Sequence, residues 1–248
     1  MEQFVGHVRR CIEDYHMISE GDHIAVGVSG GKDSLALLTA LARLRKYYPK
    51  HFDLTAITLS MGFEGMDFIP VREYCEALGI PYIIKETQLY RLIFEERKES
   101  NPCALCSKMR RGALNDAISE LGANKLALGH HFDDAVETFC LSLFYEGRIS
   151  CFEPVTHMTR SGITQIRPML YVGEGTIARI ARDYALPVVK NPCPMDGVSR
   201  REEVKQLIKT LQTQYPDLKT KIFGAMQRLP LPNWGPEPHQ RVSDRHPQ

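Results

Sequence analysis

Residues 24–34, with the sequence IAVGVSGGKDS, form the segment whose residue types most directly predict chemistry. An apolar, β-branched run ends abruptly in a pair of glycines, and a Lys-Asp-Ser triplet then leads into a helical pattern. Because glycine has no Cβ, the backbone N–H groups of such a turn can point at an anion, and the N-terminus of the next helix adds a partial positive charge. The sequence therefore predicts a phosphate-binding loop. Its residues are Gly27, Val28, Ser29, Gly30, Gly31, Lys32, Asp33 and Ser34.

The spacing of this loop separates it from two widespread nucleotide-binding loops. It fits neither the G-x-x-x-x-G-K-[ST] pattern of P-loop NTPases nor the G-x-G-x-x-G pattern of dinucleotide-binding folds. A glycine-rich turn that carries a surface lysine is the alternative interpretation. We therefore expect a phosphate site of another type than these two.

A second motif, GHHFDD at residues 129–134, follows the short apolar run KLALG. Gly129 ends this run where another segment of backbone can approach closely, and Asp133 and Asp134 begin the next helical pattern. Carboxylate oxygens suit Mg²⁺, which can also bind phosphate oxygens. The motif therefore predicts a second part of a nucleotide site at Gly129 and Asp134. The alternative is that the two carboxylates only cap the helix.

Three of the seven cysteines lie in two segments that contain proline. Cys103 and Cys106 are separated by two residues and are followed by Arg110 and Arg111, and Cys193 lies in NPCPMDG. Zinc ordinarily needs a fourth Cys or His ligand to complete a tetrahedron, whereas an iron–sulfur cluster can be held by three thiolates with one iron left open. The three cysteines are therefore candidate ligands of one metal or iron–sulfur site. A redox-active pair and a persulfide-forming cysteine are the competing interpretations.

Composition limits the classes of protein to which the chain can belong. Its 248 residues suit one large α/β domain, and 31 Lys and Arg against 30 Asp and Glu leave a net charge of +1, so any nucleic-acid surface must be a local patch. We find no apolar run that could span a bilayer and no signal peptide, which predicts a cytoplasmic protein without membrane attachment. The odd number of cysteines argues against a disulfide framework, and Cys75 and Cys140 are expected in the core.

The elements that must position these motifs follow from the periodicity of apolar residues. Strand-like and helical segments alternate, which predicts an α/β fold with a doubly wound parallel sheet, an N-terminal helix and a C-terminal helical segment. In such a sheet, ligands bind beyond the carboxyl ends of the strands, where SGGKDS, the loop after Leu59 and GHHFDD converge. The predicted strands are 24–28, 53–59, 80–84, 125–129 and 163–169, and the predicted helices are 2–18, 34–47, 68–78, 88–97, 107–122, 130–147, 174–186, 199–216 and 217–229.

Two further expectations concern boundaries. Residues 1–229 are predicted to form one domain, and residues 230–248, which are rich in proline and polar residues, are predicted to form a flexible tail. The segment NPCALC at residues 101–106 is predicted to be a loop that precedes the helix at 107–122. Two of the three grouped cysteines would therefore lie in a loop.

In combination, SGGKDS, the CxxC pair with two arginines, GHHFDD and the distal cysteine resemble the TtcA family of tRNA 2-thiocytidine synthetases. The resemblance covers residues 1–229 and implies an adenine nucleotide α-hydrolase-like fold with the PP-loop of the N-type ATP pyrophosphatases. In that family the PP-loop and GHHxDD bind ATP and Mg²⁺. Three cysteines hold a [4Fe-4S] cluster, which implies Cys103, Cys106 and Cys193 as its ligands here. The chain departs from the family at its distal site, where PMD follows Cys193 in place of a second CxxC.

The resemblance also implies a reaction and its partners. The C2 oxygen of a cytidine in the tRNA anticodon loop would attack the α-phosphate of ATP, pyrophosphate would leave, and sulfur would then displace AMP. The partners implied are tRNA and a sulfur donor, either a cysteine desulfurase or sulfide, and a homodimer is left open. The residues to which the resemblance gives catalytic roles are Asp33, Cys103, Arg110, Asp134 and Cys193.

Three other functions are compatible with the same residues. The chain could synthesise 2-thiouridine, or it could thiolate a free nucleobase or small metabolite, which its nearly neutral charge favours. It could also be an iron–sulfur sulfur carrier that binds nucleotide without turnover, although the intact SGGKDS and Asp134 argue against this.

Overall fold

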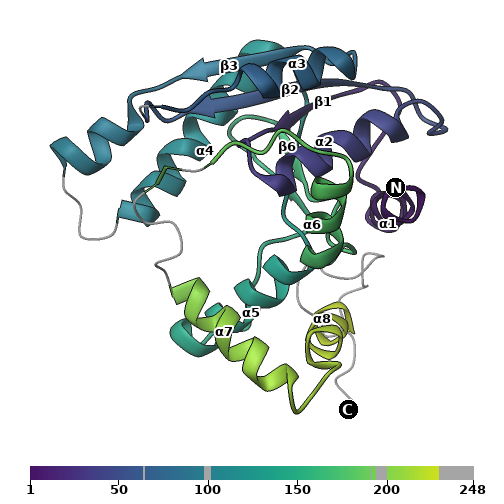
Figure 1. The fold of residues 1–248 in the computed structure, drawn as a ribbon, viewed down its shortest axis with the longest axis vertical. Coiled ribbons are helices and arrows are strands. Elements are labelled where there is room, and N and C mark those ends of the chain that lie inside the picture. The colour runs from purple at the N-terminus through teal and green to yellow at the C-terminus, as the bar shows by residue number, and fades with distance from the viewer. Residues whose placement is uncertain (64, 98–101, 191, 194–199, 229–248) are drawn as a thin grey trace, which may run out of the picture.

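A computed structural model describes residues 1–63, 65–97, 102–190, 192–193 and 200–228 of the chain (Figure 1). The predicted flexible tail at 230–248 lies outside the described residues, as does the side chain of Cys103. Among the helices that the structure describes, we find none long and apolar enough to cross a membrane.

The described strands form one sheet of six strands in the order β3-β2-β1-β4-β6-β5. Five strands run parallel, and β5 pairs antiparallel with β6 at the edge. This confirms the predicted parallel sheet and adds β5, which the sequence did not predict because this strand is defined by its antiparallel pairing with β6 and not by an apolar run of its own. The bounds are β1 Asp22–Gly27, β2 Phe52–Ser60, β3 Tyr82–Glu86, β4 Lys125–Ala127, β5 Val155–His157 and β6 Thr164–Ile166.

Nine helices are described, of which η1 is a π-helix. The predicted helix at 107–122 in fact begins earlier, at Pro102, so the prediction of a loop at NPCALC is wrong for its last five residues. Proline is compatible with this start because the first helical residue needs no N–H partner. The bounds are α1 Glu2–Asp14, α2 Lys32–Leu44, α3 Ile69–Ala77, η1 Arg91–Glu96, α4 Pro102–Leu121, α5 Phe132–Glu146, α6 Glu174–Asp183, α7 Arg200–Gln212 and α8 Leu218–Arg228.

Side chains on the two faces of β1 enter two different cores. Ile24 and Val26 pack with the buried side of α2, whereas Ala25 packs with Ile118 of α4 on the opposite face. Helix α2 contacts β1 and β2 on one side and α1 and α6 on the other, and nearly all of its residues are buried. Because α2 starts at Lys32, its burial fixes the position of the predicted phosphate loop.

A group of helices lies at one end of the molecule, below the sheet in the view of Figure 1. Helix α5 contacts both α7 and α8, and these two also contact each other. The predicted C-terminal helical segment is therefore present. Its position next to α5 matters for the site, because α5 begins within the GHHFDD motif.

Candidate functional site

The SGGKDS loop is held in shape from inside and by one distant segment. The hydroxyl of Ser34 accepts a hydrogen bond from Ser29 N–H at 3.1 Å and donates one to the carbonyl of Gly31 at 2.9 Å. Gly30 has φ +83°, and a Cβ on it would lie 3.0 Å from the Cβ of Val189, whose N–H donates to the Gly30 carbonyl at 2.9 Å. Glycine is required at position 30 for both reasons. The contact also brings the chain just before Cys193 to this loop.

The GHHFDD motif lies directly against the start of α2. A Cβ on Gly129 would be 3.1 Å from the Ser34 nitrogen and 3.1 Å from the Asp33 carbonyl carbon. The structure therefore brings the two predicted nucleotide motifs into contact at the carboxyl ends of β1 and β4. This placement agrees with the expectation from the sheet topology.

The two adjacent carboxylates of the motif have different environments. Asp133 is the more buried, and it accepts hydrogen bonds from Glu174 N–H at 2.6 Å and from Lys219 Nζ at 2.7 Å. Asp134 accepts from His131 N–H at 3.0 Å within a capping box, and its Oδ1 accepts from Arg201 Nη1 at 2.9 Å. Capping is thus one role of Asp134. Asp133 joins α5 to α6 and α8, which is a structural role.

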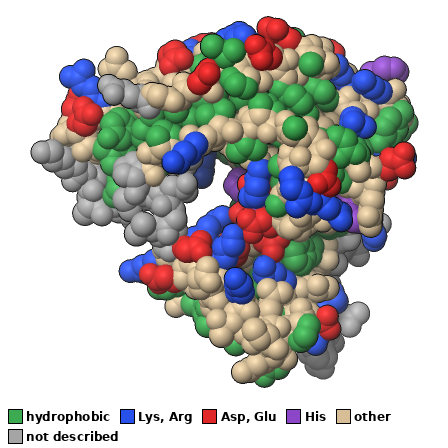
Figure 2. Space-filling model, in the orientation of Figure 1, with side chains coloured by type: hydrophobic (Ala, Val, Ile, Leu, Met, Phe, Trp, Pro, Cys, Tyr) green, Lys and Arg blue, Asp and Glu red, His purple; other side chains and the backbone are tan. Residues whose placement is uncertain are grey.

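A carboxylate that the sequence analysis did not single out bridges two lysines at the loop. Glu174, the first residue of α6, lies with its Oε1 3.3 Å from Lys32 Nζ and its Oε2 2.9 Å from Lys205 Nζ. Partial burial works against ionisation, but the hydrogen bond from Lys205 and the charge of Lys32 lower the pKa of Glu174 to about 2. Lys32 Nζ also lies 3.2 Å from Asp33 Oδ1. Figure 2 shows Lys and Arg side chains gathered with Asp and Glu side chains beside the opening between the sheet and the helices below it.

The predicted cluster ligands lie on two segments, of which the one before Cys193 contacts the SGGKDS loop through Val189. Cys103 and Cys106 are in the first turns of α4, and Cys106 packs with Met61, Leu89 and Ile93. Cys193 is partly buried and follows Val189 by four residues. Among the side chains that the structure describes, no three His, Cys, Asp or Glu residues lie close enough together to hold a metal ion. The Cys103 side chain lies outside the described part of the chain, so this search did not include it. The three-cysteine site therefore stays a prediction.

Other cysteines behave as the sequence predicted. Cys75 and Cys140 are buried, and burial raises the pKa of each thiol to about 11, so neither is a thiolate at neutral pH. Arg110 lies exposed on α4, one turn beyond Cys106 and on the same helix face as both predicted α4 ligands. This position is compatible with the contact to substrate that the sequence predicts for Arg110, and that contact stays a prediction.

Comparison with known proteins identifies the family. The family described as a PP-loop domain matches residues 2–211. A tRNA-cytidine(32) 2-sulfurtransferase from Pelobacter propionicus is 38% identical over 225 residues, which cover 90% of this chain and 84% of the relative. A protein of the same name from Alkalilimnicola ehrlichii is 40% identical over 224 residues, covering 88% of this chain and 70% of the relative. The chain belongs to the TtcA family of PP-loop proteins.

Two solved structures share the fold of this chain. The U34-tRNA thiolase NcsA from Methanococcus maripaludis, determined with its [4Fe-4S] cluster, matches with a TM-score of 0.72 and 28% identity, covering 89% of this chain and 76% of that one. The NH3-dependent NAD synthetase from Campylobacter jejuni has a TM-score of 0.51 at 17% identity and covers 91% of this chain and 93% of that one, which shows a shared fold only. The expected adenine nucleotide α-hydrolase-like fold is confirmed, and the TtcA relatives are transferases by name, so this chain is assigned to the same enzyme class.

In this TtcA-family chain, a further titratable group lies beside the nucleotide motifs. Glu137 is on α5, one turn after Asp133, and is 4% exposed. Burial raises the pKa of its carboxyl to about 7, and the positive charge of Lys205 opposes this shift only in part. Asp134 raises and Arg201 lowers the same pKa by smaller amounts. Glu137 is therefore partly protonated at neutral pH.

We expect the Glu137→Gln variant to be more stable than the unaltered chain near pH 8 and about equally stable near pH 4. Between the ordinary pKa of 4.5 and the raised value of about 7, the unfolded chain releases a proton that the folded chain keeps, so the stability of the unaltered chain falls as pH rises through this window. Glutamine does not titrate. Denaturant unfolding across this range should show a difference of about 3 kcal/mol at the alkaline end. Parallel stability curves for both proteins would contradict the assignment.

Proposed function

We propose that this enzyme uses ATP to thiolate C2 of a cytidine in a tRNA anticodon loop, with a [4Fe-4S] cluster bound by Cys103, Cys106 and Cys193. The observation that carries the proposal is the contact of three segments, in which Gly129 packs on Ser34 and Val189 packs on Gly30. A phosphate loop, an acidic motif and the segment before the distal cysteine thus meet at one sheet edge. The TtcA relatives in the comparisons are named for the same reaction on cytidine 32 of tRNA.

The loop and the acidic motif would bind ATP as its Mg²⁺ complex. Backbone N–H groups of the loop, the N-terminus of α2 and Lys32 can bind the phosphates, where they stabilise the charge that develops as pyrophosphate leaves. Asp134 is the better placed of the two carboxylates for Mg²⁺, since Asp133 joins three helices. Mg²⁺ is held in such sites by one or two carboxylates together with phosphate oxygens.

The donor set fits a [4Fe-4S] cluster with one open iron. Two of the thiols lie one helical turn apart in α4, and the third follows a segment that the Val189 N–H bond fixes to the phosphate loop. When bound, the cluster would supply an iron without a protein ligand at which the transferable sulfur is held. The contact of Val189 with Gly30 supports a position of the cluster near the bound nucleotide. Asp196, which stands where a second distal cysteine is familiar in the family, lies outside the described residues.

The reaction needs ATP because the C2 oxygen of a cytidine is a poor leaving group until it is adenylated. Attack of the cytidine C2 oxygen on the α-phosphate of ATP forms an oxygen–phosphorus bond and releases pyrophosphate. A hydrosulfide then attacks C2, the carbon–oxygen bond breaks, AMP leaves with that oxygen, and the sulfur gives up its proton. Arg110 is proposed to contact the phosphate next to the target base, which must be unstacked to enter the site.

The partners of the reaction belong to the same proposal. We propose tRNA as the substrate and sulfide or a cysteine desulfurase as the sulfur donor, in a cytoplasmic enzyme that acts as a monomer or homodimer. None of these requires a strongly basic protein, because an anticodon loop can be bound by a local patch of the surface.

The decisive assay combines two products. We expect anaerobically reconstituted protein with MgATP and sulfide to release AMP and pyrophosphate in a tRNA-dependent manner and to form 2-thiocytidine, detected by mass spectrometry of nucleosides. Parallel reactions receive free cytidine, or tRNA in which the target cytidine is replaced by uridine. ADP as the main product would refute the pyrophosphatase chemistry. Equal turnover with free cytidine would favour a small-molecule substrate.

A further inference from the structure

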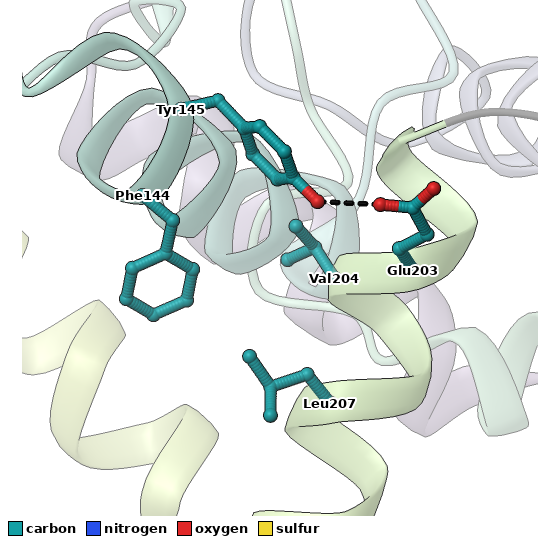
Figure 3. Close-up of a pocket in the computed structure, with 5 residues that line it drawn as sticks. All are labelled: Phe144, Tyr145, Glu203, Val204 and Leu207. Carbon is teal, nitrogen blue, oxygen red and sulfur yellow. Dashed lines mark hydrogen bonds between the residues drawn. The ribbon is translucent and has the colours of Figure 1, made fainter.

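Helix α7 is anchored on α5 by apolar and polar contacts. Val204 is buried against α5, and Figure 3 shows it between Tyr145 and Leu207, with the Tyr145 hydroxyl donating a hydrogen bond to Glu203. The guanidinium of Arg200 lies 4.8 Å from the centre of the Tyr145 ring. These contacts hold the start of α7 against the C-terminal turn of α5, and the contacts of α7 with the acidic motif, at the other end of α5, are made by other side chains.

Arg201 and Lys205 lie one turn apart on α7, and Arg201 contacts the GHHFDD motif directly, whereas Lys205 is joined to the phosphate loop through Glu174. Arg201 donates to Asp134 Oδ1 at 2.9 Å and to Thr138 Oγ1 at 2.7 Å, so it holds the carboxylate proposed for Mg²⁺. Lys205 donates to Glu174 at 2.9 Å, the same carboxylate that pairs with Lys32 of the phosphate loop. Two cations of α7 thus converge on the two halves of the predicted ATP site.

The carboxylate of Glu174 lies between two ammonium groups, a position that a phosphate could occupy in its place. Its two oxygens lie 3.3 Å from Lys32 Nζ and 2.9 Å from Lys205 Nζ, so a phosphate that replaced the carboxylate could contact both lysines. The Glu174 side chain is 30% exposed and can turn toward solvent. Lys205 therefore lies within reach of any phosphate that Lys32 binds.

We propose that Arg201 and Lys205 of α7 bind the β- and γ-phosphates of ATP by exchanging partners with the nucleotide. This inference rests on the proposed function, because it assumes that SGGKDS binds ATP. Asp134 would exchange Arg201 for Mg²⁺, and the triphosphate would replace Glu174 between Lys32 and Lys205. Lys32, Lys205, Arg201 and Asp134 then each keep an opposite charge as partner, while Glu174 turns toward solvent, so no charge is left both buried and unpaired. After cleavage, the same two residues would hold the pyrophosphate product.

Binding measurements with three probes test this assignment without turnover. We expect Arg201→Gln and Lys205→Gln each to weaken binding of MgATP and of pyrophosphate by about tenfold to a hundredfold, the range for loss of one charge-assisted hydrogen bond. Binding of AMP, which lacks both terminal phosphates, should change less than about twofold. The matched control is Lys209→Gln, which removes a positive charge from an exposed position one turn beyond Lys205 on α7 and should bind all three probes as the unaltered chain does. Melting temperatures report whether each variant is folded.

Further variants separate this inference from the proposed function. Lys32→Ala should lose MgATP binding if SGGKDS is the phosphate loop. If it does so while Arg201→Gln and Lys205→Gln bind MgATP normally, the inference is overturned and the proposed function stands. Normal MgATP binding by Lys32→Ala would overturn both. Should Arg201→Gln fail to fold, Lys205→Gln alone tests the inference, and it must show the same selective loss for pyrophosphate over AMP.

Discussion

Replacing Cys193 with alanine is expected to abolish thiolation while MgATP binding is retained. Two thiolates on α4 cannot hold a [4Fe-4S] cluster stably, whereas the phosphate loop is shaped by the hydrogen bond from the Ser34 hydroxyl to the Gly31 carbonyl and by the positive φ of Gly30. Anaerobic reconstitution of the unaltered chain should give about four irons per chain with a broad visible absorption. The variant should lose both signals, and its 2-thiocytidine product should be undetectable.

A cysteine outside the predicted set provides the control. Cys151 is partly buried, its Sγ donates only a weak bond to the Ala135 carbonyl, and burial raises the pKa of its thiol to about 12. Cys151→Ala should therefore reconstitute like the unaltered chain. Equal iron content in a variant that lacks Cys103, Cys106 and Cys193 together would show that the cluster ligands are elsewhere. One bound zinc in place of about four irons would favour a structural metal site.

Sequence periodicity predicted the elements whose stabilising contacts are local or repeated. The β1 and α2 patterns are strongly apolar because both elements are buried on nearly all sides, so their positions could be read directly. The start of α4 was misplaced because Pro102 was interpreted as part of a loop, although proline also fits the first turn of a helix. Strand β5 was missed because it is defined by its antiparallel pairing with β6 and not by a pattern of its own.

The centre of the site was predictable for a topological reason. Parallel strands place their carboxyl ends at one edge, so two loops rich in glycine and charge that follow β1 and β4 were expected to meet. The contact of Gly129 with Ser34 is the physical form of that expectation.

The partners of the carboxylates were not predictable in the same way. Lys219 and Asp133 are separated by 86 residues, and Lys32 and Glu174 by 142. Such pairs depend on where α6, α7 and α8 pack, and that packing is set by apolar side chains such as Val204. A charged residue at the start of a helix carries no signal in one sequence that it will reach a distant motif. The distinct roles of Asp133 and Asp134 therefore became visible only in the structure.

Replacing Asp134 with asparagine is expected to lower ATP-dependent pyrophosphate release by at least about a hundredfold, with only a small change in melting temperature. Asparagine keeps an oxygen that can accept the His131 N–H bond of the capping box, so the start of α5 is preserved. It removes the negative charge that the proposed Mg²⁺ needs, so the charge on the leaving pyrophosphate is less well stabilised. Asp33→Asn should also abolish turnover, because Asp33 lies in the first turn of α2 beside Lys32.

The neighbouring carboxylate provides the opposite case and makes the prediction specific. Asp133→Asn leaves the Lys219 ammonium without its acidic partner at a largely buried position, which should lower the free energy of unfolding by about 2–4 kcal/mol. Pyrophosphate release per folded molecule should fall far less than in Asp134→Asn, because Asp133 joins α5 to α6 and α8 and does not face Arg201. Asp134→Asn should therefore lose more turnover than Asp133→Asn, and Asp133→Asn should have the lower melting temperature. Equal loss of turnover in both, at unchanged stability, would show that the two carboxylates act together on the nucleotide.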